Sequence, residues 1–111
     1  MAYDEDLAMR IREVLADRTD LTERKMFGGI AFMVGGHIAC GVIKENLMLR
    51  LGEEGADVAL ERPHTRVMDF TGRPSKGAVY VEPAGTADDA GLRGWIERAL
   101  AYVSTLPPKG R

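Results

Sequence analysis

The spacing of apolar positions predicts two long helices, one near each end of the chain. In the first segment, apolar residues recur at the interval that lines one face of a helix: Leu7, Ile11, Val14 and Leu15. We expect this helix to run from about Asp4 to Asp17. The second helix has a similar apolar face: Leu92, Trp95, Ile96, Ala99 and Val103. Thr86 and Asp89 match a capping box and predict its start.

Between these helices the apolar period changes to two, which is the pattern of β-strands. Ile30, Phe32 and Val34 alternate with Ala31 and Met33 in the first strand. The turn Gly35-Gly36 leads to a second predicted strand at 37–43, and the turn Lys44-Glu45-Asn46 leads to a third at 47–51. Glycine pairs supply the positive φ angles of tight hairpin turns. The sequence therefore predicts a three-stranded antiparallel meander.

The following segment predicts shorter elements. Residues 53–62 form a helix that Pro63 ends. A short strand follows at Val67, Met68 and Phe70, then a loop over 71–77 and a strand over 78–82. The predicted order is α-β-β-β-α-β-β-α. We expect one α+β domain spanning residues 1–111, in which the amphipathic terminal helices cover the apolar face of the sheet.

Composition is that of an ordinary globular domain. Of 111 residues, 45% are hydrophobic and 29% are charged, which argues against disorder. No apolar run approaches the roughly 18 residues of a membrane helix, and the acidic N-terminal segment lacks the basic start of a signal peptide. Cys40 is the only cysteine, which excludes an internal disulfide. We expect a cytoplasmic protein with no membrane partner.

Residues that carry catalytic chemistry are few. His37 and His64 are the only histidines, and they do not show a metal-ligand spacing, so we expect no metal and no cofactor. Cys40 lies among small apolar residues, where core packing is the simpler interpretation than nucleophilic catalysis. Ser75 precedes Lys76 in a predicted loop and is better interpreted as a turn residue. The sequence predicts no catalytic residue.

Two short basic segments offer a nucleic-acid hypothesis. The segment 62–76 holds four basic residues and only Asp69 as an acid, a local charge of +3: Arg62, Arg66, Arg73 and Lys76. Arg24 and Lys25 form a second basic pair beside the hairpin. The net charge of the chain is −2, and Phe70 is the only aromatic residue in the longer segment. A solvated charged surface is the simpler interpretation.

Gly28 and Gly29 lie at the start of the predicted hairpin. No phosphate-binding glycine motif is present. Glycines inside a strand usually mark a bulge or a close approach of another backbone, and we expect one of these here. The adjacent Phe27 is expected to be buried.

The stretch that contains these glycines resembles the N-terminal domain of the TfoX/Sxy proteins. The resemblance rests on the motif Arg24, Met26, Phe27, Gly28 and Gly29, on the strand Leu47-Met48-Leu49-Arg50-Leu51, and on later residues. Those are Tyr80, Val81, Pro83, Leu92, Trp95 and Ala99. It implies an α+β domain, often dimeric, from bacterial regulators of DNA-uptake competence. Those regulators carry a second, helical domain, which we expect to be absent from a chain ending at Arg111. The resemblance brings no catalytic residues.

Three hypotheses follow. The leading one is a non-enzymatic regulatory or protein-interaction domain that forms a homodimer and binds a regulatory protein. The second is nucleic-acid binding through the two basic segments. The third is a small-molecule or enzymatic site between the sheet and a covering helix, with Cys40, His37 and Arg50 as the nearest candidates.

Overall fold

The structure is a computed structural model that describes residues 3–26, 28–67 and 77–107. Eight residues named above lie outside the described residues: Phe27, Met68, Asp69, Phe70, Arg73, Ser75, Lys76 and Arg111. The described elements are α1 (Glu5–Val14), β1 (Leu21–Met26), β2 (Gly29–Val34), β3 (His37–Ile43), β4 (Asn46–Arg50), α2 (Gly52–Leu60), β5 (Thr65–Val67), β6 (Ala78–Val81), the 3-10 helix η1 (Pro83–Thr86) and α3 (Asp89–Val103). None of these helices is long and apolar enough to cross a membrane.

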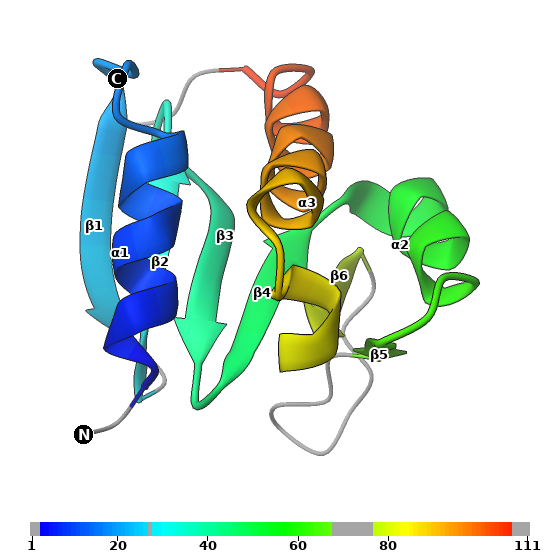
Figure 1. Ribbon diagram of the computed structural model, residues 1–111. Coiled ribbons are helices and arrows are strands. Elements are labelled where there is room, and N and C mark those ends of the chain that lie inside the picture. Colours follow the sequence, from blue (N-terminus) through cyan, green and yellow to red (C-terminus); the bar gives the residue numbers. More distant parts are fainter. Residues whose placement is uncertain (1–2, 27, 68–76, 108–111) are drawn as a thin grey trace.

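The strands form one antiparallel sheet in the order β1-β2-β3-β4-β6-β5. Figure 1 shows β1 at one edge of the sheet and β5 at the other, with α1 and α3 lying across the strands. The predicted α+β class is confirmed. The element order has one strand more than predicted, α-β-β-β-β-α-β-β-α, because β1 precedes the predicted meander.

The extra strand β1 is polar along most of its length. It pairs with β2 from Leu21 opposite Val34 to Met26 opposite Gly29. Its middle residues do not alternate between apolar and polar, so the period-two signal is missing. An edge strand tolerates this composition, and charged residues there discourage pairing with other chains.

Helix α1 is attached to this edge strand by an ion pair. The Arg12 guanidinium donates two hydrogen bonds to the Glu23 carboxylate, at 2.8 and 2.9 Å. The hydrogen bond to Glu23 raises the pKa of Arg12. At its start, α1 is capped by Asp4, whose Oδ1 accepts from the Leu7 amide at 3.1 Å. This helix ends at Val14, earlier than the predicted Asp17.

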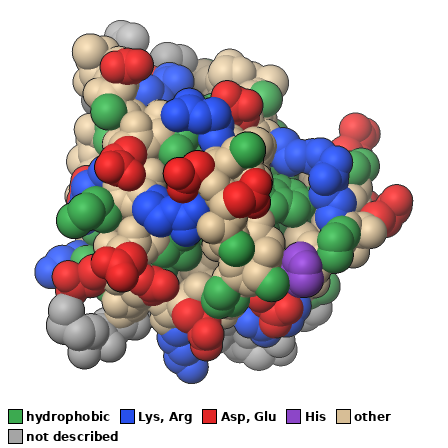
Figure 2. Space-filling model, viewed as in Figure 1, with side chains coloured by type: hydrophobic (Ala, Val, Ile, Leu, Met, Phe, Trp, Pro, Cys, Tyr) green, Lys and Arg blue, Asp and Glu red, His purple; other side chains and the backbone are tan. Residues whose placement is uncertain are grey.

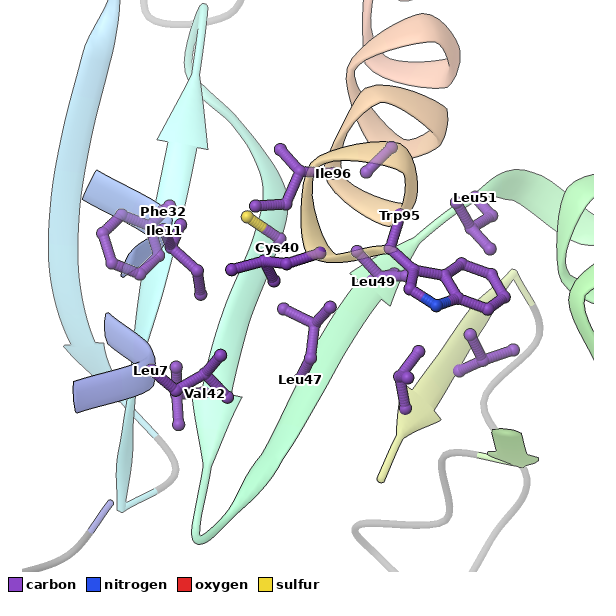
Figure 3. Close-up of a cluster of buried hydrophobic side chains, with 14 of the residues drawn as sticks. Leu7, Ile11, Phe32, Cys40, Val42, Leu47, Leu49, Leu51, Trp95 and Ile96 are labelled. Carbon is purple, nitrogen blue, oxygen red and sulfur yellow. The ribbon is translucent and has the colours of Figure 1, made fainter. Parts of the chain in front are cut away.

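The core lies between one face of the sheet and the helices. The strand registers align Phe32, Cys40, Leu49 and Val79 in one row across four strands. A second row joins buried apolar residues in the same way: Ile30, Val42, Leu47 and Val81. The helices add further buried side chains: Leu7, Ile11, Leu15, Ala56, Ala59, Leu92, Trp95 and Ile96. Figure 3 shows the α1 and α3 side chains pointing toward these rows.

The opposite side of the sheet, here called the helix-free face, carries a third row. It runs through Ala31, Gly41, Met48 and Tyr80, with Arg24 on β1 and Arg66 on β5 at its ends. Ile43, Met48 and Tyr80 form a small cluster there, and half-buried Ile38 and Ala78 pack against it. No described helix contributes to this cluster.

Two predicted boundaries are wrong in detail. Thr86 does not form a capping box with Asp89: it ends η1, its hydroxyl donates to the Pro83 carbonyl at 3.3 Å, and Asp88 is the N-cap of α3. The cause is Pro83, which begins a tight turn just before the helix. Helix α2 runs from Gly52 to Leu60, whereas the prediction was 53–62.

Candidate functional site

The glycine motif forms the connection between β1 and β2. Gly28 has a φ of +73°, a conformation that favours glycine, and a Cβ built there would meet no atom within 4 Å. Glycine is therefore favoured at position 28 by the conformation of the backbone turn. The prediction that it lies inside a strand is wrong.

Gly29 begins β2 and is a glycine for a different reason. A Cβ at this position would lie 2.1 Å from the Val42 carbonyl oxygen on β3. The predicted close approach of another backbone is confirmed here. Gly41 on β3 is in a similar position, because a Cβ there would lie 2.4 Å from the Ile30 carbonyl oxygen. Sequence reasoning did not single out Gly41, although a glycine inside an apolar strand is the same signal.

The remaining motif residues belong to β1. Arg24 lies opposite Ala31 and so belongs to the helix-free face, while Lys25 lies opposite Ile30, on the side of the helices. Both side chains are exposed. Met26 pairs with Gly29 through the backbone. The motif thus shapes a hairpin and leaves two cations at the edge of the sheet.

The two basic segments lie at opposite edges of the sheet. Arg24 and Lys25 are on β1, and Arg66 is on β5, with four strands between them. Five strand spacings correspond to roughly 24 Å. Arg66 is also paired: its Nε lies 3.0 Å from a Glu82 carboxylate oxygen, and its guanidinium lies 5.4 Å from the centre of the Tyr80 ring. The structure does not join the described basic residues into one patch.

On the helix-covered side as well, the basic residues that the structure describes do not form one continuous patch. Figure 2 shows Lys and Arg side chains intermixed with Asp and Glu side chains over this view. Arg62 lies with its guanidinium 5.8 Å from the centre of the Trp95 ring, next to Arg98 at 5.3 Å from the same ring. Arg62 is therefore held against an aromatic residue of α3.

Cys40 is fully buried in the core. Burial raises the pKa of its thiol to about 12, so the reactive thiolate is not populated near neutral pH. Figure 3 shows its sulfur among apolar side chains. The interpretation of Cys40 as a core residue is confirmed.

The other candidates do not converge on Cys40. The His37 ring donates a hydrogen bond to the Pro107 carbonyl, beyond the end of α3. His64 is exposed in the turn before β5, with a φ of +69°. The Arg50 guanidinium lies 5.7 Å from the centre of the Tyr102 ring. In the part of the chain that the structure describes, no group of three or more His, Cys, Asp or Glu residues could hold a metal ion.

A hollow with a volume of about 700 Å³ lies between α2 and α3. Residues near the start of α2 form one wall, and Arg98, Ala101 and Tyr102 of α3 form the other. This hollow could not be predicted from the sequence, because its walls come from residues about 45 positions apart in the chain.

Comparison with known proteins places this hairpin and sheet in a family. Neither the search of curated proteins nor the search of solved structures found a match. The family model for the TfoX N-terminal domain matches residues 13–103, which include the six described strands, α2 and α3. The chain therefore belongs to the TfoX N-terminal domain family.

Proposed function

We propose that this chain is a non-enzymatic regulatory domain that acts by binding proteins and that it forms a homodimer through the helix-free face. The carrying observation is that the sheet is apolar on both sides, while the described helices pack on one side only. Membership of the TfoX N-terminal domain family supports a regulatory role.

The composition of the helix-free face supports a covering protein layer. An antiparallel sheet that faces water normally alternates apolar and polar residues along each strand. Here β3 and β4 carry Ile38, Ile43 and Met48 on the second side as well. Ile43 and Met48 are already buried within the chain, so a partner would gain most from covering the half-buried Met33 and Ile38, since burial of apolar area is the main driving force of association.

The ends of the same row suit the border of an interface. Arg24 and Arg66 are both exposed, and they lie on either side of the apolar middle of the row. Protein interfaces commonly have an apolar centre, a polar rim and an enrichment in arginine. This arrangement favours a protein partner over a membrane or a small substrate.

The chemistry of the described side chains supports a role without catalysis. Cys40 is buried with a raised thiol pKa, and His37 and His64 lie in different parts of the fold with different surroundings. We therefore place the function in contact with other molecules. Control of DNA-uptake competence in the bacterial cytoplasm is the process that the family resemblance favours.

The oligomeric state tests this proposal directly. Sedimentation velocity across a wide concentration range should show a species of twice the 12.1 kDa chain mass. Variants Met33→Glu and Ile38→Glu place a carboxylate among half-buried residues of the helix-free face and should shift the protein toward monomer. Met9→Glu is the matched control, because Met9 is 59% exposed on α1.

Urea unfolding of each variant separates loss of the dimer from loss of the fold. A wild-type chain that remains monomeric at every concentration contradicts the homodimer. A dimer that survives both glutamate variants while they remain folded contradicts the choice of face.

A further inference from the structure

The hollow between α2 and α3 has the size and the lining of a small-molecule binding site. Its volume of about 700 Å³ lies within the range of roughly 300–1,000 Å³ that is usual for small-molecule sites. Aliphatic surface comes from both helices: Leu51 and Val58 face the hollow from the α2 side, and Ala101 faces it from α3. Val58 is 54% exposed, so part of its side chain is available to a molecule in the hollow.

Gly52 and Tyr102, which both line the hollow, lie in close contact. Gly52 has a φ of +77°, and a Cβ there would lie 2.6 Å from Cε1 of Tyr102. The amides of Leu51 and Gly52 both donate to the Gly77 carbonyl, at 2.7 and 3.1 Å. These contacts hold the start of α2 against the Tyr102 ring, so the fold keeps the two walls of the hollow in place.

A cation lies at the wall of the same hollow. Arg98 is half-buried and lines it, and its guanidinium lies 5.3 Å from the centre of the Trp95 ring. Among the described residues, Arg98 has no carboxylate partner. A guanidinium presents five N–H donors in a planar arrangement that matches a carboxylate. Aliphatic side chains beside an arginine that has no carboxylate partner in the described part of the chain complement an amphipathic anion.

We propose that the α2–α3 hollow binds an acyl-chain carboxylate, with the carboxylate at Arg98 and the chain along Leu51, Val58 and Ala101. Glu54 lies at the other wall and disfavours an anion there, which places the carboxylate at the Arg98 end. An aliphatic chain fits better than an aryl group. The Tyr102 ring already has Gly52 against it and the Arg50 guanidinium at 5.7 Å, which leaves little ring surface for stacking.

The test uses dodecanoate below its micelle-forming concentration. Calorimetry gives the affinity, and amide shifts in ¹⁵N-labelled protein locate the ligand. We expect the largest shifts in residues 51–58 and 98–102. Dodecyltrimethylammonium has the same chain length with the opposite charge, and it should bind at least tenfold more weakly. 1-Naphthoate has the same charge on an aromatic body and should also bind more weakly.

Two variants and one control separate the parts of the site. Arg98→Met keeps the apolar stem, removes the charge and should weaken dodecanoate binding about tenfold, since hydrogen bonds to charged groups are worth about that factor or more. Val58→Glu should abolish binding and, at an exposed position, leave the fold intact. Arg93→Met is the matched control on an exposed position of α3 and should bind as wild type does.

The proposal is overturned by any of three results. These are an absence of shifts around α2 and α3, undiminished affinity in Arg98→Met, and equal affinity for the cationic analogue. Tighter binding of 1-naphthoate than of dodecanoate overturns the choice of an acyl chain. These readouts report binding at the hollow and do not measure dimerisation, so failure here leaves the homodimer proposal standing.

Discussion

Replacing Gly29 by alanine should destabilise the fold much more than replacing the adjacent Gly28. The two glycines of the family motif have different physical roles. At Gly29, a methyl group would lie 2.1 Å from the Val42 carbonyl oxygen, a backbone atom that cannot rotate away. At Gly28 a methyl group meets nothing within 4 Å, and the cost arises from the φ of +73° alone.

The magnitudes follow from these two situations. Ordinary contact begins at 3.4 Å, so Gly29→Ala must separate β2 from β3 by about 1.3 Å at this point, the difference from 2.1 Å. Such a shift weakens at least one backbone hydrogen bond and adds packing strain, for a total of about 3 kcal/mol. Gly28→Ala should cost about 1 kcal/mol for the left-handed conformation. Gly28→Asn should cost less, because asparagine tolerates that conformation.

Urea unfolding followed by the fluorescence of Trp95, the only tryptophan, measures all three variants. For a domain of this size, 3 kcal/mol corresponds to a fall in melting temperature of roughly 12–24 °C. Equal stability of Gly29→Ala and wild type would refute the close-approach argument. A Gly28→Asn variant as unstable as Gly29→Ala would refute the distinction between the two glycines.

Three further predictions concern other parts of the fold. Burial raises the pKa of the Cys40 thiol from 9.0 to about 12. The contribution of the buried thiol to stability is therefore present below pH 9 and is lost as the pH rises toward 12. Over that range, urea unfolding should show that wild type loses about 1.4 kcal/mol of stability per pH unit more than Cys40→Ala does. Gly52→Ala should cost about 2 kcal/mol of stability in wild type and about 1 kcal/mol in a Tyr102→Ala background. Alanine at position 102 removes the clash with the new methyl group, so only the strain of the positive φ at position 52 remains. Equal costs in both backgrounds would contradict the contact between Gly52 and Tyr102. Glu23→Gln should cost under about 1 kcal/mol, and the cost should shrink at high salt, because its pair with Arg12 is partly exposed; a cost that is independent of salt would show that the pair acts through packing.

Much of the fold could be predicted because the core elements carry strong periodic signals. The α3 face at Leu92, Trp95 and Ile96 and the alternation in β2 through β4 both arise from burial on one side of an element. The tight turn at Gly35-Gly36 was also predictable, and the structure shows φ values of +61° and +86° there. These features depend on residues that are close together in the chain.

The missed features depend on contacts between distant segments. β1 has no apolar alternation and is attached through its backbone pairing with β2 and through the ion pair of Glu23 with Arg12. The contact that requires Gly29 comes from β3, and the one that requires Gly52 comes from Tyr102 on α3. A glycine in the sequence shows that one of several constraints applies, and the fold decides which one.

The two proposed surfaces lie on opposite sides of the sheet, and this placement has a functional consequence. The α2–α3 hollow is on the helix-covered side, where Ala56, Ala59 and Trp95 join the core, whereas Ile38 and Met48 belong to the helix-free face. A second copy that covers the helix-free face would therefore leave both hollows of the dimer open. The two surfaces are joined through β4, since Leu49 packs under the helices while the adjacent Met48 belongs to the other face. A ligand that prefers the α2–α3 arrangement of the dimer would consequently strengthen dimerisation by the same factor as the dimer strengthens ligand binding. Sedimentation of the dimer with and without dodecanoate measures that factor, and a value of one would show that the two surfaces act independently.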